Sequence, residues 1–202
     1  GGQAGGSKGN LIIAGGTEVL SGTNSYSGVI SYTGNTNINP GATLALIGNG
    51  SVASSNNIFN AGVFDISATT NGATIKNIEN NAVNLGSKTL TITNAGNNGS
   101  GNTSVVSGVF FGDSLSQINL TSGTLAVSGN SGNGFLGSTV IGSNTTLAIK
   151  DNGSLSGSNV LDVSGILDLQ TNNTVNLSNL KLTSTGLITN SNGSASLLVS
   201  GM

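Results

Sequence analysis

The fold of this chain is decided by the stretch TLALIGNGSVASSNNIFNAGVFDI, residues 43–66, because a second stretch repeats its pattern 103 residues later. Laid without a gap on TLAIKDNGSLSGSNVLDVSGILDL, residues 146–169, it is identical at ten of 24 positions. A chain that repeats in this way is typically built from stacked structural units. Most apolar positions also exchange one apolar residue for another: Val52 with Leu155, Ile58 with Leu161, Phe64 with Leu167, and Ile66 with Leu169.

Short segments with alternating apolar and polar residues recur along the whole chain. This period of two is typical of β-strands with one buried face, and no window shows sustained helical spacing. Clusters rich in Gly, Asn and Ser separate the segments and favour turns. The spacing between equivalent apolar residues is close to 20, as from Leu147 to Leu167 to Leu187. The alternating segments are residues 43–47, 63–66, 89–93, 118–120, 124–127, 146–149, 166–169 and 175–183.

This pattern predicts an all-β fold, a right-handed parallel β-helix (solenoid) with about 20 residues per coil and roughly ten coils. Each coil would pair its backbone with the coils on either side, and inward Leu, Ile, Val and Phe would form a continuous apolar column. Gly and Asn suit the corners, where positive φ is needed and identical amides can hydrogen-bond along the stack. Residues 1–10 are expected to be a flexible or edge segment, and residues 11–202 a single β-helix belonging to a longer domain.

The composition excludes several classes of protein. Gly, Asn, Ser and Thr supply 115 of the 202 residues, yet only 6% of residues are charged and the net charge is −2. The five cationic residues are all lysine, so no basic surface for nucleic acid is expected. The chain has no cysteine and no histidine, which excludes disulfides and thiolate metal sites.

Residues 16–53 read GTEVLSGTNSYSGVISYTGNTNINPGATLALIGNGSVA, and they resemble the passenger-associated transport repeat of Gram-negative autotransporters. Residues 29–33 form an insertion relative to that repeat, and Glu18 stands where an apolar residue is usual. The matching residues are Leu20, Ser21, Gly22, Asn24, Tyr26 and Gly28 in its first half, and Thr36, Ile38, Gly41, Thr43, Leu44, Leu46, Gly50 and Ser51 in its second.

The resemblance implies an autotransporter (type V secretion) passenger domain, located outside the cell or on the surface of a Gram-negative bacterium. It would contact the membrane only through a C-terminal outer-membrane barrel that is not among these 202 residues. Such repeats are associated with folding and secretion of the passenger stalk. Large two-partner-secreted adhesins build similar helices, so the route of secretion stays open.

Residues 112–115 spell Gly-Asp-Ser-Leu, which resembles the nucleophile block of the GDSL esterase and lipase family. A serine nucleophile needs a general base, nearly always histidine, and this chain has none. Lys150 and Lys181 lie in no recognisable base motif. Ser114 is therefore expected to be a turn residue.

The acidic residues are too dispersed to predict a catalytic pair or a metal site. Asp65 and Asp168 occupy equivalent positions of the repeat and should point outward, about five coils apart. Asp162 and Asp168 are close in sequence, but solvated surface acids are the expectation for both. The calcium-binding pattern G-G-x-G-x-D is absent from GGQAGGSKG, so no metal and no cofactor are expected. An ice-binding face would need regular Thr-x-Thr repeats, which do not recur over successive coils.

The expected contact residues are Thr89, Thr91, Thr93, Phe110 and Phe111. The threonines alternate outward. The neighbouring phenylalanines break the alternation: one ring outside would be a contact point, but filling of the core at a widened coil is the favoured interpretation.

The chain is therefore predicted to be a non-enzymatic extracellular passenger segment that acts in adhesion or self-association. Its partners would be a host-cell surface or an identical passenger on another cell, with a homo-oligomer as one form. Two alternatives remain: the cell-binding, oligomerising part of a secreted toxin, and a passive stalk for another domain.

Overall fold

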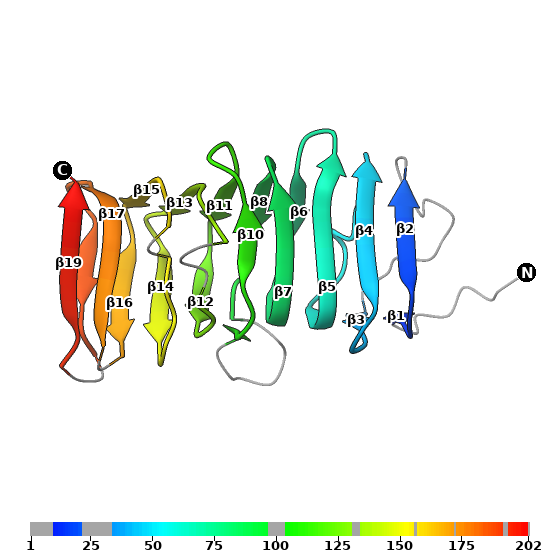
Figure 1. Cartoon of the computed structure of the whole chain (residues 1–202), viewed down its shortest axis with the longest axis horizontal. Helices are drawn as coiled ribbons and strands as arrows, with labels where there is room; N and C mark the ends of the chain where they lie inside the picture. Colours follow the sequence, from blue (N-terminus) through cyan, green and yellow to red (C-terminus); the bar gives the residue numbers. More distant parts are fainter. Residues whose placement is uncertain are drawn as a thin grey trace, which may run out of the picture.

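The computed structural model describes residues 10–21, 34–96, 104–130, 134–155, 157–171, 173–191 and 194–201. Within these ranges the chain contains β-strands and turns and no helix. All of its strand pairs are parallel. Figure 1 shows the strands side by side across one long axis, from the blue N-terminal coil to the red C-terminal coil. The predicted parallel β-helix is confirmed.

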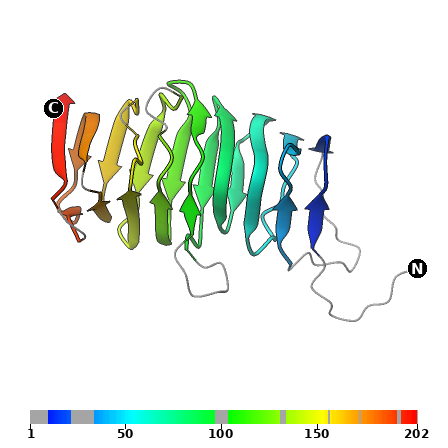
Figure 2. The same ribbon diagram turned by 60° about the horizontal axis from the view of Figure 1, so that its bottom comes forward.

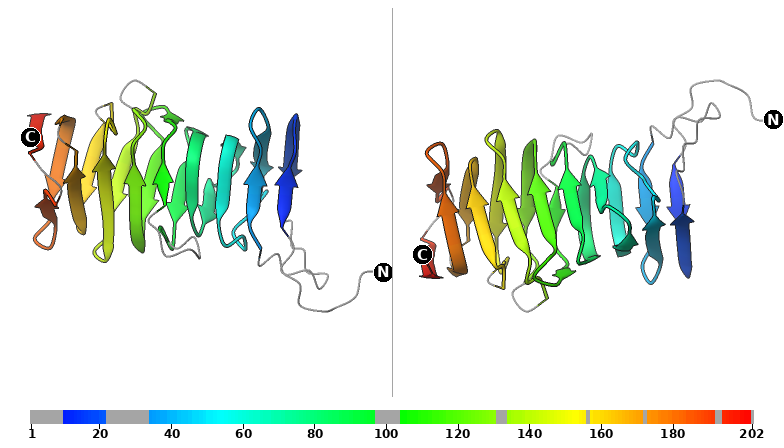
Figure 3. Two further views of the ribbon diagram at one scale, coloured as in Figure 1. Left: turned by 90° about the horizontal axis from the view of Figure 1, so that it is seen from below. Right: turned by 90° about the horizontal axis from the view of Figure 1, so that it is seen from above.

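The coils stack into three faces, seen from other sides in Figures 2 and 3. Three long strands, β5 (Ile58–Thr69), β7 (Ile78–Gly86) and β17 (Thr174–Leu182), each bend from one face to the next, so they pair with two sets of neighbours. The first face contains β1 (Leu11–Ile13), β3 (Thr36–Ile38), the starts of β5 and β7, β9 (Val105–Val106), β12 (Gly123–Val127), β14 (Thr145–Lys150), β16 (Ile166–Gln170) and β18 (Leu187–Thr189).

The second and third faces complete each coil. The second face contains β2 (Thr17–Ser21), β4 (Thr43–Gly48), the later parts of β5 and β7, and β10 (Phe110–Gly112); further along, the start of β17 pairs with β19 (Ser196–Gly201). The third face contains β6 (Ala73–Ile75), β8 (Thr89–Ile92), β11 (Gln117–Leu120), β13 (Ser138–Ile141), β15 (Val160–Val163) and the end of β17.

The coils are slightly longer and slightly fewer than predicted. Nine strands follow one another on the first face, with an average of about 22 residues per turn. Single steps vary widely, from 17 residues between Ala73 and its partner Leu90 to 28 between Thr89 and Gln117. The sequence spacing of about 20 residues gives the length of the regular coils correctly, but it does not account for the extra residues in the longer ones.

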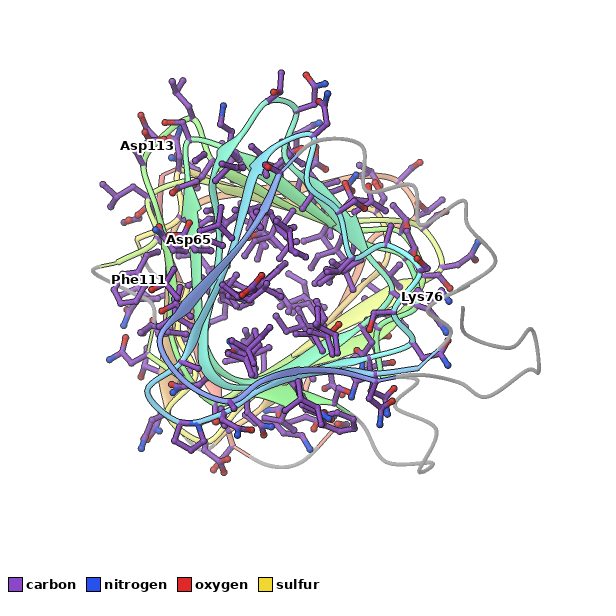
Figure 4. The ribbon with its side chains drawn as sticks, turned by 90° about the vertical axis from the view of Figure 1, so that its right-hand side faces the viewer. Asp65, Lys76, Phe111 and Asp113 are labelled. Atoms are coloured by element: carbon purple, nitrogen blue, oxygen red, sulfur yellow. The ribbon has the colours of Figure 1, made fainter. Side chains whose placement is uncertain are left out.

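The interior is filled by the inward side chains that the alternation predicts. The eight apolar residues of the four pairs that match in the internal repeat are buried, with exposed fractions from 0% to 8%. The end-on view of Figure 4 shows side chains stacked inside the space that the three faces enclose. Because successive strands are fixed by backbone hydrogen bonds, each inward side chain packs mainly on its equivalents in the neighbouring coils.

One corner of the solenoid carries a ladder of asparagines. Asn10, Asn35, Asn57 and Asn77 each precede a strand of the first face. The backbone N–H of Asn35 donates to Oδ1 of Asn10 (2.9 Å), and Nδ2 of Asn77 donates to Oδ1 of Asn57 (2.9 Å). The prediction that amides hydrogen-bond along the stack is confirmed at this corner.

Asn77 is the most heavily bonded member of this asparagine ladder. Its side chain is fully buried, its Nδ2 also donates to Oγ of Ser104 (2.5 Å), and its Oδ1 accepts from the backbone N–H of Gly96 (3.0 Å). The ladder therefore links three consecutive coils through one residue.

We expect Asn77→Ala to lower the free energy of unfolding by about 2 kcal/mol, because buried partners lose their hydrogen bonds. Chemical denaturation followed by circular dichroism measures this change. The control is Asn81→Ala, since Asn81 is exposed and makes one bond to the carbonyl of Ala61. Equal losses of unfolding free energy in the two variants would show that burial of the asparagine ladder does not contribute to stability.

Candidate contact surface

The two neighbouring phenylalanines of β10 point to opposite sides of the second face. Phe110 is 1% exposed, and its ring packs against Phe135 with the centroids 6.4 Å apart. Phe111 is 43% exposed. Core filling, the favoured interpretation, therefore holds for Phe110 alone, and Phe111 is the ring that lies outside. Phe110 belongs to the core and is wrong as a contact residue.

The three predicted threonines lie on the outer side of the third face. Thr89 and Thr91 are half-buried residues of β8 that alternate with buried Leu90 and Ile92. Thr93 follows the strand, and its hydroxyl donates to the carbonyl of Ile75 in the preceding coil (3.1 Å). Thr89 and Thr91 thus present their side chains outward, whereas the Thr93 hydroxyl is bonded to its own solenoid.

These threonines belong to two outward columns that run along the third face. The columns carry hydroxyl, amide and β-branched side chains, in register from coil to coil. One column is Thr89, Gln117, Ser138 and Val160; the other is Thr74, Thr91, Asn119, Val140, Asp162 and Lys181.

The charges in these columns compensate each other. Nζ of Lys181 lies 2.5 Å from Oδ2 of Asp162, and the lysine side chain is 66% exposed. Such an exposed ion pair adds little stability, but it leaves this stretch of the face without net charge.

Ser114 lies in an exposed turn between β10 and β11. Oδ1 of Asp113 accepts the backbone N–H of Leu115 (2.9 Å), and the carbonyl of Asp113 accepts the N–H of Ser116 (3.1 Å). The hydroxyl of Ser87 donates to Oδ2 of Asp113, and this bond, helped by the Leu115 N–H, lowers the pKa of the Asp113 carboxyl. The structure therefore places the Gly-Asp-Ser-Leu segment in an Asx-type turn.

The acidic residues singled out in the sequence do not come together. Asp65 lies on the second face and Asp168 on the first, so the expectation that they occupy equivalent places in the coil is wrong. Asp162 lies on the third face, with a face boundary between it and Asp168. In the described ranges, no group of three or more Asp, Glu, His or Cys residues could hold a metal ion.

Asp168 is buried, which corrects the expectation of a solvated acid. It is 8% exposed, and its carboxylate is bonded from the next coil: Oδ1 accepts the N–H of Ser191 (3.0 Å) and Oδ2 accepts its hydroxyl (2.6 Å). Nε2 of Gln170 also donates to Oδ2 (2.8 Å). Burial alone would raise the pKa of Asp168, but these hydrogen bonds outweigh it and lower the pKa below 3.8.

We expect Asp168→Asn to destabilise the protein by about 1–3 kcal/mol near neutral pH, because the amide cannot accept all three bonds. Since folding lowers this pKa, the carboxylate stabilises the fold at pH values above 3.8 and loses that contribution as the pH falls through the folded-state pKa. Urea unfolding of both proteins well above and well below pH 3.8 measures the difference. If the difference in unfolding free energy between the wild type and Asp168→Asn did not become smaller in acid, the stabilising role of the ionised carboxylate would be contradicted.

Among the described residues, there is no helix long and apolar enough to cross a membrane. Comparison with known proteins gives no match to this chain, whether to a family model, to a curated protein or to a solved structure.

Proposed function

We propose that this chain is a non-enzymatic β-helical passenger segment of a bacterial autotransporter, carried outside the cell, where it acts in adhesion or self-association. The observation that carries the proposal is the outer side of the third face, where one column of mostly polar and β-branched side chains crosses six strands, a second crosses four, and the one ion pair is compensated. The sequence resemblance of residues 16–53 supports the passenger assignment, although Gly22, Asn24, Tyr26 and Gly28 lie outside the described residues.

Two copies of such a face can meet without electrostatic repulsion. Thr91 and Asn119 are adjacent in one column, and Thr89 and Gln117 are adjacent in the other, so hydroxyl and amide groups recur at the strand spacing of about 4.8 Å. An identical face offers donors and acceptors with the same repeat. Each contact is weak, but many copies on one cell add their contacts by multivalency.

The test is aggregation of microspheres coated with the protein. We expect the wild type to aggregate, and the triple variant Thr74→Lys, Thr91→Lys, Asn119→Lys to aggregate about tenfold less, because like charges then oppose each other along the face. These three residues lie next to one another in one column.

The matched control carries three lysines at exposed turn positions: Asn71→Lys, Ser143→Lys and Asn144→Lys. It has the same net charge as the first variant and should aggregate like the wild type. Equal loss in both variants, or no aggregation of wild-type beads, would contradict self-association through this face. Killing of host cells by the soluble protein would favour the toxin alternative instead.

A further inference from the structure

A third outward column lies on the second face, away from the columns used for self-association. It crosses five strands in register, from β2 through β4, β5 and β7 to β10. Its last three positions bring a carboxylate, a carboxamide and an aromatic ring into adjoining coils. The column is Val19, Ala45, Asp65, Asn84 and Phe111.

The ring of Phe111 lies close over a glycine in the next coil. A Cβ atom placed on Gly134 would come within 2.9 Å of Cδ1 and 3.2 Å of Cε1 of Phe111. One edge of the ring therefore lies over a position that has no side chain, and 43% of the residue stays exposed. The absence of a side chain at Gly134 leaves room for the ring to lie along the solenoid, where a ligand can reach its exposed part.

The two polar side chains beside this ring keep hydrogen-bonding groups for a ligand. Oδ1 of Asn84 accepts the N–H of Gly86 (3.2 Å), which orients the amide and leaves Nδ2 without a partner in the described part of the chain. Oδ1 of Asp65 accepts the N–H of Ser67 (2.8 Å), which similarly leaves Oδ2 for another donor. Figure 4 shows Asp65, Phe111 and Asp113 on the same side of the solenoid, opposite Lys76.

We propose that Phe111, Asn84 and Asp65 form a binding site for a neutral glycan chain that lies along the solenoid axis. The C–H groups on one side of a pyranose ring pack on an aromatic ring, and its hydroxyls can donate to a carboxylate and accept from an amide. The negative charges of Asp65 and Asp113 disfavour acidic sugars. This inference gives a ligand class to the proposed adhesive role, but it uses a different face from self-association.

The test is affinity electrophoresis of the folded protein in native gels containing dextran, soluble β-glucan or galactomannan, with polygalacturonate as the acidic probe. We expect at least one neutral polysaccharide to retard the wild type, and polygalacturonate not to. Phe111→Ala should weaken binding roughly five- to tenfold, and Phe111→Trp should keep it, because the indole restores the stacking surface. Asn84→Asp keeps the acceptor for Gly86 but loses the donor, so it should also weaken binding.

The control is Leu115→Ala, which removes a 76% exposed apolar side chain from the neighbouring turn and should leave retardation unchanged. Failure of every neutral polysaccharide to retard the wild type overturns the proposal, and so does equal loss in Leu115→Ala and Phe111→Ala. The lysine variant of the third face should bind glycan normally. If Phe111→Ala abolishes bead aggregation while no glycan binds, the second face is a protein contact and the glycan site is wrong.

Discussion

Replacing Phe64 by alanine should lower the free energy of unfolding by about 3–5 kcal/mol, the range for truncation of a buried aromatic side chain. Phe64 is fully buried in β5, between Leu44 of the preceding coil and Val83 of the following one. Both neighbouring strands are held at a fixed spacing by ladder hydrogen bonds, so the coils cannot close over the space that the ring leaves. The cost therefore includes the residual cavity as well as the lost apolar burial.

The measurement is urea unfolding followed by far-ultraviolet circular dichroism. Phe111→Ala is a matched control, because it makes the same chemical change two strands away on the outer side of the same face. It should cost well under 1 kcal/mol, since surface substitutions usually stay within about 0.5 kcal/mol. Similar losses in the two variants would show that the interior is not a tightly packed column.

The fold was predictable because the same pattern of alternating apolar and polar residues recurs in each coil of a solenoid. Alternation places residues such as Leu44 and Leu46 inward, and the same pattern recurs at each coil. Coil length was less predictable, because extra residues in a turn change the register step without changing any strand. The departure at Glu18 has a simple reason in the structure: it is in register with Leu44, but it lies in the N-terminal coil, where its side chain is exposed.

The two copies of the internal repeat match in sequence but lie on different faces of the solenoid. Thr43 starts a strand of the second face, whereas its counterpart Thr146 lies in a strand of the first face. The offset of 103 residues falls between four and five turns of about 22, so the second copy is rotated by one face. The strand and turn pattern is the same in both copies, but the neighbours are not. Asp65 and Asp168 therefore have different partners.

The candidate contact residues depended on information that spans coils. In Phe110–Phe111 the sequence left open whether both rings fill the core, and the packing of Phe135 against Phe110 shows that only Phe110 does. The position of the Phe111 ring depends on the room left at Gly134, and the sequence gives no hint of that contact. The asparagine ladder did leave a signal, since an asparagine stands directly before Thr36, Ile58 and Ile78 at the start of three successive first-face strands.

Gly123→Ala should destabilise the protein by about 2–5 kcal/mol, because two costs coincide at this residue. Gly123 has a φ of +86°, which side chains rarely adopt, and a Cβ placed there would lie 2.0 Å from the carbonyl oxygen of Ala95. That oxygen also accepts the N–H of Thr124 (2.9 Å), so it cannot move aside without breaking the contact between coils.

Two other glycines separate the costs at Gly123. Gly41→Ala tests positive φ alone, since Gly41 has a φ of +75° and nothing within 4 Å of its Cβ position, and it should cost about 1 kcal/mol. Gly15→Ala has neither problem and should leave the stability unchanged or slightly raised. Denaturant midpoints of the three variants should fall in the order Gly15→Ala, Gly41→Ala, Gly123→Ala. If Gly123→Ala lost no more stability than Gly41→Ala, the carbonyl of Ala95 would have to move away from the new Cβ atom. The close backbone contact between these two coils would then be wrong.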